Sequence, residues 1–282
     1  MKKSMRPVQY RRLAIVCGAT LMFFCYPLLT AERTGQALGI KEILLNNSMA
    51  VRPAGLVDTV ENLEKVLSIA EAGNLLVAWY RATSDGHMRI DVFSDDTRVY
   101  SEGKDDAGVW EWPGDKDGPE DVYHEGVGAL EHGIEFNIFC LAEFPGRGHE
   151  VELAGRETIR GAHYFVLKIT LADGFETFRY VNPETWQVDM SRDFRAFHPG
   201  LDSTRKDIET RFDQWEQVDG VVFASRSQNV DVESGEVLAT IRVLRSRYNL
   251  PAHELELARS YVPAEAPTAG RKIAGSTAVP LR

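Results

Sequence analysis

The stretch 154-AGRETIRGAHYFVLKITLADGFETFRYVNPETW-186 decides the fold class of this chain. It holds two apolar runs joined by Ala172-Asp173-Gly174, and a second turn follows at Asn182-Pro183. An Asp-Gly pair between alternating apolar residues is a strong signal for a β-hairpin. The predicted hairpin carries no obvious nucleophile, metal-ligand pair or phosphate-binding loop, which makes its apolar surface the informative feature.

Further strands are predicted on both sides of this hairpin. Apolar residues alternate at 74–82 and 88–93 around Ser84-Asp85-Gly86, and again at 97–102 and 109–112. Strands at such spacing, without helices between them, predict an antiparallel meander and a mainly β (α+β) fold. From residue 149 onward the predicted strands are 149–154, 157–160, 163–171, 175–182, 186–194, 207–218, 221–231 and 237–248.

Apolar residues at helical spacing predict a small number of helices. Two N-terminal helices are predicted, one over 40–52 and one over 58–73. Residues 113–128 are acidic and rich in Gly and Pro, which predicts a loop. Residues 128–144 then predict one or two short helices that end at Pro145-Gly146.

The N-terminus is typical of a secretory signal peptide. The apolar run 13–29 is short for a membrane span and follows a basic start made of Lys2, Lys3, Arg6, Arg11 and Arg12. We therefore predict a signal peptide over 1–31, with cleavage after Ala31 or Ala37, and a periplasmic protein. The alternative is an uncleaved anchor in the inner membrane, with the protein facing the periplasm.

The rest of the chain is predicted to form one domain and a tail. A hydrophobic fraction of 44% is enough for a packed core, and the domain is placed at 38–262. The small, Pro-rich residues of 263–282 predict a disordered tail. Cys17 and Cys25 lie in the signal segment, so Cys140 is the one cysteine left, and it can form neither an internal disulfide nor a thiolate metal site.

Charge excludes some classes of partner. Loss of the five basic residues of the signal segment takes the formal net charge from −10 to −15. Such acidity argues against nucleic acid and against an anionic lipid surface bound through a basic patch. We expect no nucleic-acid partner, no cofactor and a monomer.

Catalytic and metal-binding patterns give little support to an enzyme. His124 and His132 are eight residues apart, which matches no established ligand spacing, so no metal site is predicted. No serine lies in a strand-to-helix elbow, and Cys140 follows an apolar pair that predicts a buried side chain. A hydrolase would require His149, His163 or His198 to converge with carboxylates in one cleft. We predict no catalytic residues and no enzymatic activity.

Apolar side chains on the strands are the candidate binding site. A curved meander with few helices leaves a concave apolar face partly uncovered, and such a face can hold an apolar ligand. The competing hypothesis is that the same residues form an ordinary core. The candidates for the cavity lining are Trp79, Phe165, Leu167, Ile169, Phe178, Tyr180, Met190 and Phe212.

Residues 40–262 resemble the LolA/LolB-like periplasmic lipoprotein-carrier superfamily, in particular its outer-membrane lipoprotein-sorting group. The similarity is strongest in 148–192 and 208–230, and Asn182 and Ala224 depart from the usual Asp and Pro. Upstream, Arg89 and Trp110 match a further family segment. Within the strongest part, the matching positions are Gly155, Glu157, Gly161, Tyr164, Leu167, Gly174, Tyr180, Thr185 and Val218-Asp219-Gly220.

This resemblance implies a curved antiparallel half-barrel with helices over its open face, enclosing a hydrophobic cavity for acyl chains. The lid would correspond to 117–145, with Gly126, Gly128 and Gly133 as hinge residues. The implied function is that of a non-enzymatic carrier for acyl chains of lipids or lipoproteins, working with an inner- or outer-membrane partner protein. The alternative is an envelope sensor or interaction module that uses the fold to bind a protein partner.

Overall fold

The protein was analysed as a computed structural model, which describes residues 38–53, 57–122, 126–198, 202–263 and 265–267. The predicted signal peptide, His124 and nearly all of the predicted tail lie outside these residues. The boundaries of the predicted domain and tail stay predictions.

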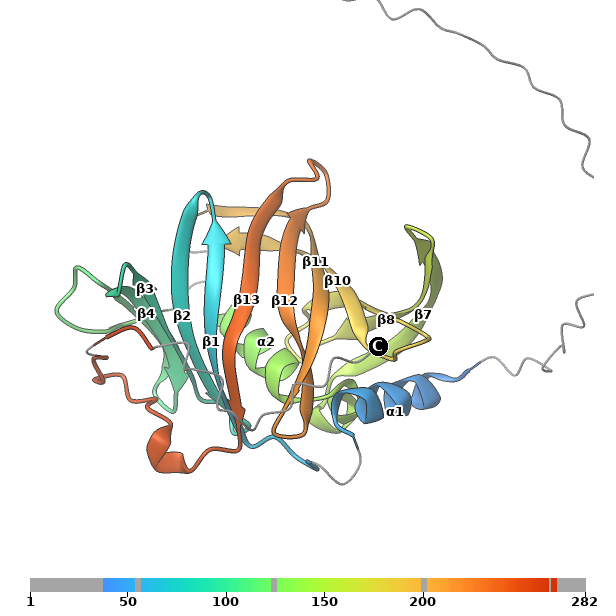
Figure 1. The fold of residues 1–282 in the computed structure, drawn as a ribbon, viewed down its shortest axis with the longest axis horizontal. Helices are drawn as coiled ribbons and strands as arrows, with labels where there is room; N and C mark the ends of the chain where they lie inside the picture. The colour runs from blue at the N-terminus through green and yellow to red at the C-terminus, as the bar shows by residue number, and fades with distance from the viewer. Residues whose placement is uncertain (1–37, 54–56, 123–125, 199–201, 264, 268–282) are drawn as a thin grey trace, which may run out of the picture. The chain divides into compact units, whose positions relative to one another are not determined.

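A single antiparallel sheet of 13 strands dominates the fold, in the order β6-β5-β4-β3-β2-β1-β13-β12-β11-β10-β9-β8-β7 (Figure 1). Two meanders run outward from the centre, where β1 pairs with β13. The first comprises β1 (Asn62–Glu71), β2 (Asn74–Thr83), β3 (Met88–Ser94), β4 (Thr97–Asp105), β5 (Gly108–Pro113) and β6 (Glu120–Asp121). The second comprises β7 (Glu150–Ile159), β8 (Ala162–Thr170), β9 (Glu176–Val181), β10 (Val188–His198), β11 (Asp202–Val218), β12 (Val221–Asp231) and β13 (Val237–Tyr248).

The predicted helix over 58–73 is wrong, since this segment contains strand β1. Leu63 and Val66 are both fully buried, but they are three residues apart and therefore lie on opposite faces of the strand. A central strand buried on both faces gives the same apolar spacing as one side of a helix. Of the two predicted N-terminal helices, the described residues contain the first, α1 (Ile40–Val51).

The other predicted helices are confirmed. Helix α2 spans Gly126–Ile138, and the 3-10 helix η1 spans Leu141–Arg147 and contains Pro145. Gly148 ends η1 in the left-handed region, with a φ of 84° that glycine adopts without strain. A second 3-10 turn, η2, spans Ala252–Glu254.

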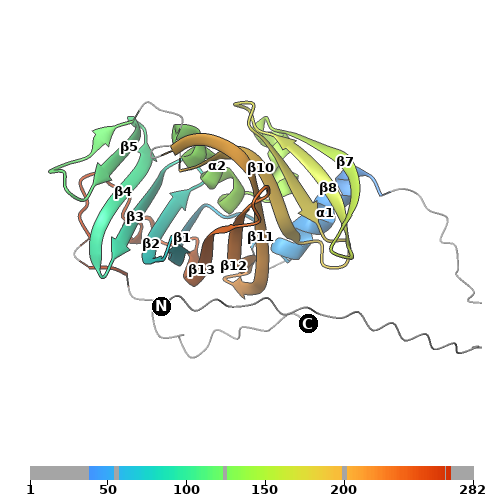
Figure 2. The same ribbon diagram turned by 90° about the horizontal axis from the view of Figure 1, so that it is seen from above.

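Local irregularities bend the sheet. Register shifts occur in several strand pairs, and Gln214, within the long strand β11, has a φ of 56°. Bulges of this kind increase the local bend of a strand. The predicted strands 149–154 and 157–160 are one strand, β7, with such a shift between Leu153 and Gly155. Figure 2 shows the sheet curving around α2, as the half-barrel prediction requires.

Two apolar clusters lie on the face of the sheet that α2 covers, which we call the inner face. In one cluster, Leu130, Ile134 and Ile138 of α2 pack with residues of β1, β2, β3, β5, β12 and β13. In the other, α1 and η1 pack against β8 and β9. The inner face is therefore divided between α2 and the α1–η1 pair.

The opposite, outer face of β2 and β3 carries a buried charge cluster. Arg81, Arg89 and Asp91 have no exposed surface. Arg89 Nη2 donates to Asp91 Oδ1 at 2.7 Å, Arg81 also forms an ion pair with Asp91, and Ser101 Oγ donates to Asp91 Oδ1 at 2.5 Å. One carboxylate thus pairs with two guanidinium groups that are buried away from water.

The C-terminal segment 251–262 closes over this cluster. Arg81 Nη1 donates to the carbonyl oxygen of Glu256 at 2.6 Å, and Arg89 Nη2 donates to that of Tyr261 at 2.6 Å. The Tyr261 ring lies edge-on to Trp79, with 6.3 Å between the ring centroids. The segment is therefore fixed to the sheet by the buried arginines.

Candidate functional site

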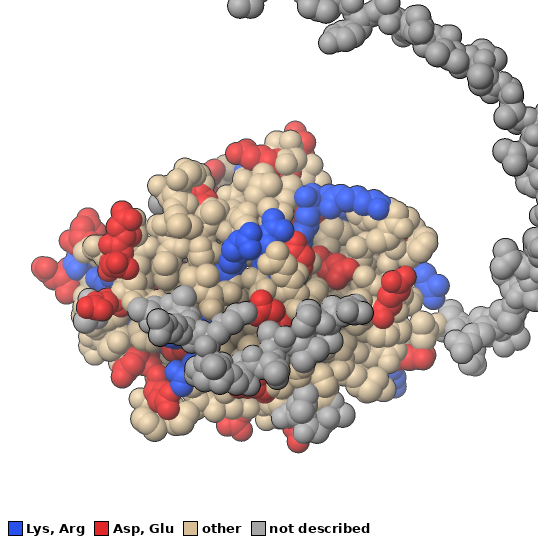
Figure 3. All heavy atoms as spheres, viewed as in Figure 1, with Lys and Arg blue, Asp and Glu red and all other residues tan. Residues whose placement is uncertain are grey.

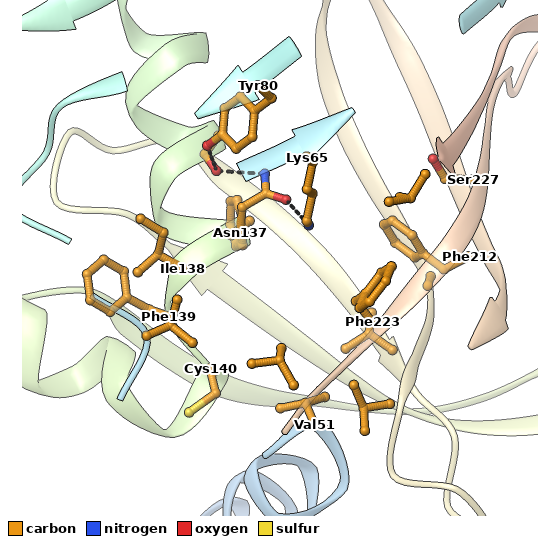
Figure 4. A pocket seen from close by; sticks show the side chains of 18 of the residues that line it. Val51, Lys65, Tyr80, Asn137, Ile138, Phe139, Cys140, Phe212, Phe223 and Ser227 are labelled. Carbon is orange, nitrogen blue, oxygen red and sulfur yellow. Dashed lines mark hydrogen bonds between the residues drawn. The ribbon is translucent and has the colours of Figure 1, made fainter. Parts of the chain in front are cut away.

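A cavity of about 480 Å³ lies between α2 and the inner face of the sheet (Figure 4). Its wall comes from α1, α2, η1 and strands of both meanders. Most of the lining is aliphatic or aromatic, including Leu130, Phe139, Phe212, Phe223 and Val243. The volume is within the range of about 300–1,000 Å³ that is usual for small-molecule sites.

One corner of the cavity is polar. Lys65 Nζ of β1 donates to Asn137 Oδ1 of α2 at 2.9 Å, and Asn137 Nδ2 donates to the carbonyl oxygen of Gly133 at 2.8 Å. Tyr80 Oη of β2 donates to the same carbonyl at 3.3 Å (Figure 4). Burial lowers the pKa of Lys65 to about 8 and raises the pKa of Tyr80. These bonds join α2 to two strands of the sheet.

A second cation, Arg179 of β9, also lines the cavity. Its guanidinium carbon lies 3.8 Å from the centroid of the Phe136 ring of α2, and its Nε has no hydrogen-bond partner among the described residues. Burial lowers the pKa of Arg179, although the charge of Asp193 on the neighbouring strand opposes this.

The third cation, Arg52, is already paired. Arg52 Nη1 lies 2.9 Å from Glu143 Oε2, and Nη2 donates to the carbonyl oxygen of Ile138. Cys140 lies beside this pair, and its Sγ donates to Glu143 Oε2 at 2.9 Å. Burial raises the pKa of the Cys140 thiol, which keeps it protonated and unreactive at neutral pH.

Of the predicted lining residues, Phe212 lies on the cavity wall. Phe165, Leu167 and Ile169 do share the inner face, but they pack beneath α1 and η1 in the second apolar cluster. These three residues belong to an ordinary core, as the competing hypothesis expects. Their side chains fill the part of the inner face that α1 and η1 cover.

The other predicted lining residues face outward, so their expected orientation is corrected. Phe165 pairs with Val181 and Leu167 with Arg179, which puts Phe178 and Tyr180 on the opposite face from the Phe165 row. Tyr180 is buried there with Met190, while 37% of Phe178 is exposed.

Trp79 is also on the outer face. It precedes the cavity-lining Tyr80 on β2, so alternation points it away from α2, and its Nε1 donates to Glu64 Oε2 at 3.0 Å.

The three predicted hinge glycines lie in α2. Gly126 begins the helix, Gly128 falls in its first turn, and Gly133 lies at its middle and lines the cavity. Their predicted role as hinges stays a prediction. Glycine in a helix costs about 1 kcal/mol relative to alanine, so these positions weaken α2.

The sequence did not single out Lys65, Arg179, Asn137 or Tyr80. Lys65 lies within 58–73, where the sequence predicts a helix and the structure has strand β1. Had 62–71 been assigned as a strand, the row Leu63, Lys65 and Leu67 would have placed this lysine among apolar side chains on one face.

The histidines of the hydrolase hypothesis have separate partners. His149 Nε2 lies 3.0 Å from Glu135 Oε2, His163 Nδ1 lies 2.8 Å from Thr158 Oγ1, and His198 bonds to Glu71. Within the described ranges, no three His, Cys, Asp or Glu side chains are grouped as a metal site would need, and no helix has the length and apolarity to span a bilayer.

The outer face of β10 to β12 carries a group of arginines around a buried acid. The Glu209 carboxylate lies within 3.2 Å of Arg160, 2.8 Å of Arg192 and 2.6 Å of Arg211. Figure 3 shows basic side chains forming a band across the face that β11, β12 and β13 present to the viewer. One acid among three cations leaves this part of an acidic chain locally positive.

Comparison with known proteins gives matches in structure alone. No protein-family model and no curated protein matches the sequence. The structure of LolA superfamily protein NE2245 from Nitrosomonas europaea matches with a TM-score of 0.52 at 15% identity, over 78% of this chain and 98% of that one. The structure of a putative outer membrane lipoprotein-sorting protein domain from Vibrio parahaemolyticus matches with a TM-score of 0.50 at 10% identity, over 77% of this chain and 95% of that one. The chain therefore has a LolA-like fold, which confirms the predicted half-barrel and the resemblance in fold.

Proposed function

We propose that this chain is a periplasmic, monomeric, non-enzymatic protein that binds and carries acyl chains of lipids or lipoproteins. The observation that carries the proposal is the apolar cavity between α2 and the inner face of the sheet. The periplasmic location rests on the predicted signal peptide over 1–31.

The energetics of such a cavity suit a hydrocarbon chain. Each buried methylene contributes about 0.8 kcal/mol, so ten buried methylenes contribute roughly 8 kcal/mol. A net binding free energy of about −8 kcal/mol corresponds to a Kd of about 1 μM, and the entropic cost of ordering the acyl chain makes the affinity weaker than this. The cavity supplies affinity through apolar contact and needs no reactive group.

Loading and release require α2 to move away from the sheet. Among the described residues the polar contacts between them are few: Lys65 to Asn137, Tyr80 to Gly133, and an ion pair of 2.6 Å between Lys104 and Glu131. His132 of α2 also lies 2.7 Å from Asp173 in the turn between β8 and β9. A helix weakened by glycine and held by a few polar contacts can act as a lid.

Extraction of the purified protein tests the proposal. Protein isolated from a bacterial envelope without detergent is extracted with organic solvent, and the extract is analysed by mass spectrometry. We expect acyl lipids in near-stoichiometric amount and, after their removal, rebinding of a fluorescent fatty acid. An extract free of lipid, together with no fatty-acid binding, would rule the proposal out.

The arginine group gives a specific reason to keep a second candidate function, an envelope interaction module. Glu209 is buried, whereas the side chains of the three arginines around it are partly exposed. Arg226 of β12, which also pairs with Asp213 at 2.9 Å, directly opposes Arg242 of β13 and adds to the basic side chains of this face. Carboxylate-rich segments of a partner protein would pair with such donors.

Crosslinking in intact cells separates the two functions. If partner binding is the function, an envelope protein adduct is expected to disappear in the Arg211→Glu, Arg226→Glu double variant while acyl binding is unchanged. An adduct that survives this double variant, or that never forms, would count against the interaction module.

A further inference from the structure

We infer that the acyl ligand of this cavity carries an anionic head group, a carboxylate or a phosphate, which binds Lys65 and Arg179 beneath α2. The inference rests on the proposed function and adds the charge of the ligand to it. The chain as a whole is acidic, with a formal net charge of −10. The cavity wall has the opposite character: its charged residues are Arg52, Lys65 and Arg179, and no Asp or Glu is among its described lining.

Lys65 is a cation without a counter-ion. Its bonding partner is the neutral amide of Asn137, and its ammonium also lies 5.6 Å from the centroid of the Phe223 ring. Among the described residues it pairs with no carboxylate. Lys65 is half-buried, and a charge that is partly removed from water is costly unless it is paired, so its ammonium at the wall of an apolar cavity favours an anion as ligand.

Arg179 repeats this arrangement on the other meander. Within the described part of the chain no carboxylate lies within 4 Å of its guanidinium. Asp193, the acid on the adjacent strand, instead lies 3.6 Å from Arg195. Arg179 rests on Phe136, which is the residue before Asn137 in α2. Both unpaired cations therefore touch neighbouring residues of the same helix.

Arg52 differs from these two cations because its charge is paired and its role is structural. It pairs with Glu143 and caps the end of α2 through the carbonyl oxygen of Ile138. Among the described residues no carboxylate forms an ion pair with Lys65 or Arg179, although the charge of Asp193 on the adjacent strand acts on Arg179. A head group with two or more oxygen acceptors supplies the missing partner while its chain occupies the apolar part of the cavity.

The pH dependence follows from the groups around Lys65. Anion binding needs the ammonium form, so affinity for a carboxylate falls as pH rises through the pKa of Lys65, about 8. Burial raises the pKa of the other titratable groups of the cavity wall, which keeps them neutral at this pH. These groups are Tyr80 on β2, Tyr248 on β13 and Cys140 before η1, and the remaining charges are Arg52 and Arg179.

The test compares three probes with one chain length: a fluorescent fatty acid, its methyl ester and the corresponding alkyl phosphate. Each is titrated against the full-length mature protein by fluorescence, below and above the pKa of Lys65. We expect the anionic probes to bind at least about tenfold more tightly than the ester, because hydrogen bonds to charged groups are worth more than those to neutral ones. The stronger of the two anions identifies carboxylate or phosphate as the preferred head group.

Two variants locate the effect. Lys65→Gln is expected to lower affinity for the fatty acid by about tenfold, to leave the ester unchanged and to abolish the pH dependence. The control is Lys168→Gln on the outer face of β8, where the lysine pairs with Glu176 at 2.5 Å. This control is expected to bind all probes as the wild type does.

The outcomes are distinguishable. Equal affinity of the wild type for acid and ester would overturn the inference and leave the acyl-binding proposal standing. An equal loss of both probes in Lys65→Gln would also overturn it, since Lys65 would then act through the shape of the cavity. If no probe binds the wild type, both the inference and the proposed function fail.

Discussion

The Ser227→Trp variant is expected to lose most of its affinity for long-chain fatty acids. Ser227 of β12 lies opposite Phe212 on one side and Ile241 on the other, and all three line the cavity (Figure 4). An indole at this position occupies space that the acyl chain would fill. Displacement of only two methylenes, at about 0.8 kcal/mol each, weakens binding by roughly tenfold. Fluorescence titration with a fatty acid measures the loss.

Gln228→Trp is the matched control for this variant. Gln228 is the next residue along β12 and points to the outer face, where its Nε2 donates to Thr240 Oγ1 at 3.2 Å. Its affinity for fatty acid is expected to stay at the wild-type level. Wild-type affinity in a folded Ser227→Trp protein would show that the chain binds elsewhere.

Asp91→Asn is expected to produce the largest loss of stability of any single substitution considered. The substitution keeps the shape of the side chain but removes the one negative charge between Arg81 and Arg89, which are both fully buried. Breaking a buried ion pair from one side costs about 3–5 kcal/mol. That is a large part of the roughly 5–15 kcal/mol by which a native protein is stable. Denaturant unfolding measures the change.

Asp95→Asn is the control for a carboxylate without a buried partner. Asp95 is exposed in the turn between β3 and β4, and its φ of 48° lies in the region that asparagine tolerates. Its free energy of unfolding is expected to match that of the wild type. A similarly small effect of Asp91→Asn would mean that the two arginines find other partners when the carboxylate is gone.

The same cluster sets a pH dependence of stability. Burial raises the pKa of Asp91, but hydrogen bonds from Arg89 and Ser101 and the charge of Arg81 outweigh it, so the pKa lies below its ordinary value. A depressed pKa gives stability that is present above the unfolded-state pKa and is lost as pH falls through the folded-state value. As pH is lowered, the free energy of unfolding is therefore expected to fall more steeply in the wild type than in Asp91→Asn.

Turn chemistry made most of the fold predictable from the sequence. The Asp173-Gly174 turn joins β8 and β9 as expected, and Gly174 has a φ of 88° that requires glycine or an equivalent residue. Most of the strands after residue 163 were predicted because they are bounded by turn residues of this kind. Local signals of this kind do not depend on what lies across the sheet.

The site was less predictable because it depends on which face each strand turns inward. In the observed pairing of β8 with β9, Phe178 and Tyr180 lie on the outer face and Arg179 lines the cavity. A register shifted by one residue would exchange the two faces. Alternation within one strand cannot fix this register. The assignment of β1 as a helix hid Lys65 for a related reason, since a strand buried on both faces lacks the two-residue period.

The most direct test of the central claim is photocrosslinking of a fatty acid that carries a diazirine on its chain. The labelled protein is digested and the adducts are located by mass spectrometry. If the cavity holds the acyl chain, adducts are expected on the inner-face residues around Phe223 and Ser227 of β12 and on the α2 segment around Asn137. Adducts confined to outer-face residues such as Phe178 and Phe194, or none in a protein that is otherwise folded, would contradict the claim.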